Sequence, residues 1–74
     1  MKYTERIREL REDRDKTQTQ IAELLKVGQK TYSDYELGKT RIPIDSLLLL
    51  AKLYDVSMDY ISGASNIRRQ YPKE

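Results

Sequence analysis

The sequence has no cysteine, no histidine, no tryptophan and no phenylalanine, and only three glycines among its 74 residues. Without cysteine, the chain can form neither a disulfide framework nor a thiolate metal site, and a reducing compartment fits. Histidine and cysteine, two frequent catalytic residues, are absent, the carboxylates are set among arginines on predicted exposed faces, and no glycine-rich phosphate loop is present. We therefore expect that the protein is not an enzyme and uses no metal, cofactor or small-molecule ligand.

Long apolar runs are also missing from the sequence. A membrane-spanning helix needs roughly 18 or more apolar residues, and no such stretch occurs. The first ten residues, MKYTERIREL, lack the apolar segment of a secretory signal. These absences predict a cytoplasmic protein with no membrane partner.

Size and charge set weak limits on function. A chain of 74 residues forms one small domain with a limited core, so self-association is a reasonable expectation. Fourteen Lys and Arg against twelve Asp and Glu leave a net charge of only +2, which alone is a poor indication of nucleic-acid binding. The placement of charge is more informative, because four basic residues surround one predicted helix: Lys26, Lys30, Lys39 and Arg41.

The apolar residues follow helical spacing throughout, and no strand-like alternation appears. The pattern predicts an all-α, compact five-helix bundle, with helices at residues 4–13, from 17 to a hinge at 26–28, and at 29–37, 44–54 and 58–62. Thr4 is a plausible cap of the first helix, and Thr17 with Gln20 forms a capping box. Gly38 suits a left-handed helix end. Residues 64–74 are expected to form a loose polar tail.

The second and third predicted helices have the layout of a helix-turn-helix unit. Small and apolar side chains can close a core between them: Ile21, Ala22, Leu25, Val27, Tyr32 and Tyr35. The outward positions of the third helix are polar, and short enough to reach base edges in a major groove. The tyrosines are expected in the core, because the alternative of stacking on nucleotides needs bases that are splayed out.

With these residues placed, the chain resembles the Cro/CI-type helix-turn-helix family, the Xre-like bacterial and phage repressors. The resemblance covers residues 3–63 and is carried by Arg6-Ile7-x-x-Leu10-Arg11, Thr17-Gln18-x-x-Ile21-Ala22-x-x-Leu25, Val27, Tyr35-Glu36-x-Gly38-Lys39, Ile42-Pro43 and Leu50-Ala51-x-x-Tyr54-x-Val56-Ser57-x-Asp59-Tyr60-Ile61-x-Gly63. It implies a lambda-repressor-like domain over 1–63, with the helix-turn-helix at about 17–36 and a tail at 64–74. Two positions depart from the family pattern: Gly28 caps the reading helix, and Asp34 replaces a neutral or basic residue.

The resemblance assigns roles to individual residues. Base contacts are expected from Gln29, Lys30, Thr31, Ser33 and Asp34, and phosphate contacts from Gln18, Lys39, Thr40 and Arg41. Glutamine can bind adenine in a bidentate manner and lysine can reach guanine, while an aspartate either accepts from cytosine or is simply held away from the phosphates. Arg11 and Glu36 are expected to form a structural ion pair across the core.

The leading hypothesis is a sequence-specific regulator of transcription that binds double-stranded DNA, acting as a repressor and as a homodimer on an inverted repeat. Met58, Tyr60 and Ile61, with the surplus leucines of the fourth helix, are candidates for the self-association surface, although the fifth helix could equally be a lid on the core. The alternative is an antitoxin-like or other protein-interaction module with the same fold. That role favours apolar anchors on the third helix, where this chain has polar residues. Nonspecific architectural DNA binding requires more positive charge.

Overall fold

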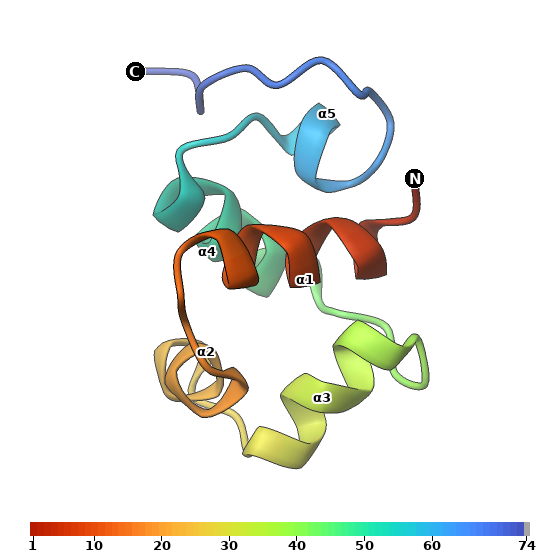
Figure 1. Cartoon of the computed structure of the whole chain (residues 1–74), viewed down its shortest axis with the longest axis vertical. Coiled ribbons are helices and arrows are strands. Elements are labelled where there is room, and N and C mark those ends of the chain that lie inside the picture. The colour runs from red at the N-terminus through yellow and green to blue at the C-terminus, as the bar shows by residue number, and fades with distance from the viewer. Residues whose placement is uncertain (74) are drawn as a thin grey trace.

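The computed structural model describes residues 1–73, which form five helices and no strand (Figure 1). The helices are α1 (Tyr3–Asp13), α2 (Gln18–Leu25), α3 (Gln29–Leu37), α4 (Ile44–Tyr54) and α5 (Met58–Ile61). In Figure 1, α1 crosses the middle of the domain, α2 and α3 lie on one side of it, and α5 with the C-terminal segment lies on the other. The predicted all-α bundle of five helices is confirmed. No helix within residues 1–73 has the length and apolar character needed to span a bilayer.

Local side-chain chemistry explains where α2 begins. The amide of Gln20 donates to the hydroxyl of Thr17 at 3.1 Å, and the amide of Thr17 donates to Oε1 of Gln20 at 2.8 Å. This reciprocal arrangement satisfies two amides that the helix itself leaves without partners, so the predicted capping box is confirmed. The prediction for Thr4 is wrong, because α1 already begins at Tyr3 and the amide of Lys2 donates to the carboxylate of Glu5 at 3.4 Å.

The core lies between all five helices. Its apolar members are Ile7, Leu10, Ile21, Ala22, Leu25, Tyr32, Tyr35, Leu47, Leu50, Ala51, Tyr54, Val56 and Ile61. The rings of Tyr32 and Tyr35 meet edge to face, with centroids 6.2 Å apart, which is a favourable geometry for two aromatic side chains. Tyr32, Tyr35 and Tyr54 are all at most 4% exposed, so their predicted place in the core is confirmed. Their burial fixes which face of α3 remains in solvent.

Gly28 caps α3 without a side chain to do so. Its φ of −72° and ψ of 156° suit any residue, and a Cβ there would meet no atom within 4 Å. A serine at this position can accept from the amide of Thr31, so Gly28→Ser should raise the free energy of unfolding by a few tenths of a kcal/mol, measured by urea denaturation. Gly63→Ser is the control and should destabilise, because φ is 85° and a Cβ would collide with the carbonyl of Met1. Destabilisation by Gly28→Ser would contradict this account of the cap.

The polar segment after Gly63 packs back on the helices, which corrects the expectation of a loose tail. The amide of Ser57 donates to the carbonyl of Arg69 at 2.8 Å, and Tyr71 packs against the edge of the core. The guanidinium of Arg6, only 3% exposed, donates to the carbonyl of Tyr60 at 2.8 Å and to Oδ1 of Asn66 at 2.9 Å. A buried side chain of α1 therefore fastens the end of α5 and the segment that follows it.

Candidate nucleic-acid interface

One face of α3 is turned into the domain and the other is turned to solvent. Tyr32 and Tyr35 anchor the inner face in the core, where α3 packs on α2 and α1. On the outer side, Gln29, Lys30 and Thr31 are exposed, while Ser33 and Asp34 are half-buried. All five residues predicted to contact bases are therefore at least partly accessible to solvent on a single helix. The major groove of DNA is wide enough to admit an α-helix.

A chain of hydrogen bonds connects the exposed start of α3 to the interior. Arg11 binds Glu36 through both carboxylate oxygens, with Nε to Oε2 at 2.7 Å and Nη2 to Oε1 at 3.0 Å. The side-chain amide of Gln18 donates to Oε1 of Glu36 at 3.1 Å. In turn, Gln29 donates through Nε2 to Oε1 of Gln18 at 2.8 Å. The predicted Arg11–Glu36 pair is thus present, and it extends to two residues of the outer surface.

The hydrogen bonds in this chain all run in one direction, from donor to acceptor, toward Glu36. An ionised carboxylate only accepts, so Glu36 must receive the NH₂ group of Gln18, and the carbonyl of Gln18 is left to face Gln29. Gln29 then points its own NH₂ group at Gln18 and keeps Oε1 and its second N–H available. One acceptor and one donor side by side are what the N6 and N7 atoms of adenine require. The buried charge of Glu36 therefore orients the side-chain amide of Gln29 through Gln18.

Glu36 stays ionised in this setting. Burial opposes its charge, but the hydrogen bonds from Arg11 and Gln18 outweigh that effect and hold the pKa of Glu36 below its ordinary value. Burial and the nearby Glu36 raise the pKa of Tyr54 to about 12, so its ring remains neutral. Within the described part of the chain, the hydroxyl of Tyr54 has no hydrogen-bond partner. The buried charge at this site therefore comes from the Arg11–Glu36 pair.

Lys30 and Asp34 lie one helical turn apart on α3. The ammonium of Lys30 is 3.7 Å from Oδ2 of Asp34, and the two side chains are 85% and 21% exposed. An exposed pair of this type contributes little to stability. Asp34 does, however, offset the positive charge of Lys30 on the exposed side of α3.

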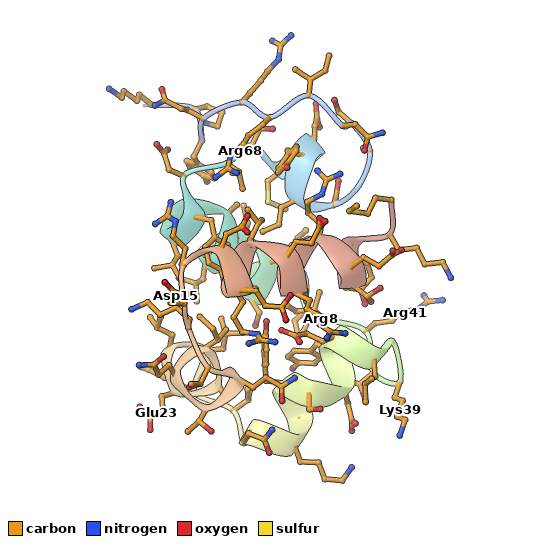
Figure 2. All side chains as sticks on the ribbon, in the orientation of Figure 1. Arg8, Asp15, Glu23, Lys39, Arg41 and Arg68 are labelled. Carbon is orange, nitrogen blue, oxygen red and sulfur yellow. The ribbon has the colours of Figure 1, made fainter. Side chains whose placement is uncertain are left out.

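The loop after α3 presents the remaining basic residues. Gly38 ends the helix with a φ of 76°, and the carbonyl of Asp34 accepts from the amides of Lys39 and Thr40 at 3.0 and 3.3 Å. These bonds turn the chain sharply, so that Lys39 and Arg41 extend away from the body of the domain beside α3 (Figure 2). Lys39, Thr40 and Arg41 are all exposed, as contact with a DNA backbone requires.

The residues predicted for self-association are not together on an open surface. Ile61 is fully buried in the core, which corrects its assignment to a contact surface. Met58 and Tyr60 are half-buried and pack against the same core, and Tyr60 is covered by the guanidinium of Arg6 at 3.8 Å from its ring centroid. Helix α5 therefore serves mainly as a lid on the core.

Comparison with known proteins also identifies a helix-turn-helix domain in this chain. A family model described as helix-turn-helix matches residues 7–61. The chain is 41% identical over 64 residues to the uncharacterised HTH-type transcriptional regulator YobD of Bacillus subtilis, covering 86% of this chain and 57% of YobD. It is 34% identical over 70 residues to the HTH-type transcriptional regulator ImmR of the same organism, covering 95% of this chain and 55% of ImmR.

A phage protein is also similar. The chain is 37% identical over 54 residues to the cryptic phage CTXphi transcriptional repressor RstR of Vibrio cholerae, covering 73% of this chain and 49% of RstR. The chain thus spans about half the length of these curated relatives. No solved structure matches it significantly. The family match over α1 to α5, together with these relatives, shows that the chain belongs to the Cro/CI-type (Xre-like) helix-turn-helix family.

Proposed function

We propose that this chain binds double-stranded DNA in a sequence-specific manner and regulates transcription, with α3 in the major groove. The observation that carries the proposal is the ordered amide of Gln29, held by Gln18 and Glu36 with one donor and one acceptor available on an exposed helix. Lys39, Thr40 and Arg41 are suited to bind the backbone on one side of α3. The relatives that are named as transcriptional regulators support the same role.

The finer form of the proposal is repression by a homodimer on an inverted repeat. Repression is supported by the name of RstR, a transcriptional repressor, whereas another relative, BcrR of Enterococcus faecalis, is named an activator. A two-fold dimer would place two copies of α3 in successive major grooves, with half-sites about 34 Å apart. A protein-interaction role is less well supported, because the exposed residues of α3 are polar except for Leu37 at its C-terminal end, which is 63% exposed.

Selection of bound duplexes from a random pool tests the proposal, and Gln29→Ala then tests the reading residue. We expect Gln29→Ala to relax preference at one base position and to weaken binding of the selected site by about 1–3 kcal/mol, with little effect on random DNA. Gln70→Ala, which removes an exposed amide of the C-terminal segment, is the matched control and should bind as the wild type does. Equal loss on selected and random DNA would rule out base reading by Gln29.

Salt dependence tests the backbone contacts separately. Lys39→Ala should reduce the slope of log affinity against log salt by about one, because one fewer phosphate is neutralised. Arg68→Ala removes the same charge at the end of the domain opposite α3 (Figure 2) and should leave the slope unchanged. Equal slopes for the two variants would show that Lys39 is not at the interface.

A further inference from the structure

The outer side of α4 carries apolar residues that the domain leaves uncovered. The helix turns 100° per residue, and its buried residues Leu47, Leu50, Ala51 and Tyr54 lie on one side. Asp45, Leu48, Leu49 and Lys52 lie on the opposite side and are here called the outer α4 face. Leu49 lies at its centre and is 52% exposed, while Leu48 is half-buried. Leu48 and Leu49 therefore form a small apolar centre between the two charged residues of this face.

The charges on the outer α4 face are arranged to complement themselves. Asp45 and Lys52 are seven residues apart, about 10.5 Å along a helix, and the midpoint between them falls between Leu48 and Leu49. The ion pairs among residues 1–73 are Arg8–Glu12, Arg11–Glu36 and Lys30–Asp34, so neither Asp45 nor Lys52 takes part in one. The ammonium of Lys52 lies 5.8 Å from the ring centroid of Tyr71, near the edge of this face.

A two-fold axis through that midpoint, perpendicular to α4, aligns a second copy of the helix antiparallel to the first. Asp45 then faces Lys52 of the second copy, and Lys52 faces its Asp45. Leu49 then lies closest to Leu49 of the second copy, and Leu48 to its Leu48, because the two leucines point about 100° apart on the helix. A single patch on one helix thus supplies both halves of an isologous contact, with two ion pairs on either side of an apolar centre.

We propose that the outer α4 face is the self-association surface of this chain and that its occupant is the same face of a second copy. The link to an inverted repeat rests on the proposed function, but the contact itself does not. Helix α3 contributes no residue to the outer α4 face, so the predicted reading surface and the proposed contact belong to different helices. A contact of one 11-residue helix is smaller than a standard interface of about 800 Å² per partner, so the dimer is weak in solution and strengthened by DNA.

Sedimentation equilibrium without DNA, from about 1 μM to about 1 mM, measures the association. Leu49→Ala should raise the dissociation constant of the dimer about tenfold or more, because both copies lose apolar contact area at the centre. Leu24→Ala is the matched control, since Leu24 lies on α2 and is also 52% exposed, and it should associate as the wild type does. Equal association of the two variants would overturn the proposal, as would a wild-type chain that stays monomeric throughout.

Charge reversal tests the pairing between copies. In Asp45→Lys, each of the two ion pairs between the copies becomes a pair of lysines. The dissociation constant of the dimer should therefore rise about tenfold, and Lys52→Asp should have the same effect. The double variant Asp45→Lys, Lys52→Asp restores opposite charges and should associate within about threefold of the wild type. A double variant as weak as either single one would overturn the antiparallel arrangement.

Binding to a DNA duplex with one half-site separates this inference from the proposed function. Leu49→Ala should bind a single half-site as the wild type does and lose affinity only for the full inverted repeat, because only the contact between copies is weakened. A wild-type chain that dimerises as expected but binds no DNA would refute the proposed function and support the association surface.

Discussion

Replacing Glu36 with alanine is expected to lower the free energy of unfolding by about 3–5 kcal/mol, because the Arg11 guanidinium is left without its carboxylate partner in a largely buried position. The two side chains are only 12% and 3% exposed, and the ion pair is bidentate. A domain of this size has a total stability of about 4–11 kcal/mol. Glu36→Ala should therefore be close to unfolded at room temperature, as urea denaturation followed by circular dichroism will show.

Another ion pair of the same chain provides the matched control. Arg8 and Glu12 also pair, at 3.5 Å, but their side chains are 63% and 53% exposed. Glu12→Ala should change the free energy of unfolding by no more than about 0.5 kcal/mol, because exposed pairs are screened by water. If Glu36→Ala and Glu12→Ala were equally stable, the Arg11–Glu36 pair would not be structural.

The same carboxylate predicts a dependence on pH. The pKa of Glu36 is lowered from an ordinary value of 4.5, because its hydrogen bonds to Arg11 and Gln18 outweigh the effect of burial. A carboxyl whose pKa is lower in the folded state stabilises the fold fully above about pH 4.5, and that contribution is lost as the pH falls through the folded-state pKa. The stability difference between wild type and Glu36→Gln should therefore be largest near neutral pH and shrink in acid. A difference that did not change with pH would contradict an ionised Glu36.

The helices could be predicted from the sequence because the signals that define them are local. The spacing of apolar residues selects the buried side of each helix. The Thr17–Gln20 capping box determines where α2 begins, and the left-handed Gly38 determines where α3 ends. Both signals act within a few residues of the helix end concerned. The cap of α1 is the exception. Tyr3 is already helical, so Thr4 lies inside the helix and its hydroxyl is not at the cap position.

The candidate site could be predicted only in part. Burial of Tyr32 and Tyr35 determines the outer face of α3, so the residues available to DNA follow from helical spacing alone. Helical spacing does not, however, predict how the side chains of these exposed residues are oriented. Gln18 is expected at a phosphate, yet its amide is held between Glu36 and Gln29, which are 18 and 11 residues away. Such contacts depend on how α2 and α3 pack, and a list of residue types does not contain that information.

The burial of Arg6 does not follow from residue type, although the helical spacing contains a signal for it. It lies three residues after Tyr3 and four before Leu10, so it shares their inward stripe on α1. Charge argues against burial, because an isolated ion in a protein interior is costly. The structure resolves the conflict by surrounding the guanidinium with the carbonyl of Tyr60, the side chain of Asn66 and the face of the Tyr60 ring. All of these partners come from a segment about 54 to 60 residues later in the chain.

Arg6→Ala is expected to lower the free energy of unfolding by about 2–4 kcal/mol. The substitution removes two short charge-assisted hydrogen bonds and the contact with Tyr60, and it leaves a cavity between α1 and α5. The C-terminal segment should separate from the domain before the rest unfolds. Amide hydrogen exchange can follow this at Ser57, whose N–H is held only by the carbonyl of Arg69, 2.8 Å away.

Arg6→Met separates the packing of the side chain from its hydrogen bonds. Methionine fills much of the same volume, and replacing a buried charge by an apolar side chain of similar size often costs little stability. We expect Arg6→Met to recover most of the stability that Arg6→Ala loses, while Ser57 remains unprotected, because no donor holds Tyr60 and Asn66. A variant in which the amide of Ser57 is as protected as in the wild type would show that the segment packs without Arg6. If both variants lost equal stability, the hydrogen bonds rather than the filled volume would determine how α1 joins α5.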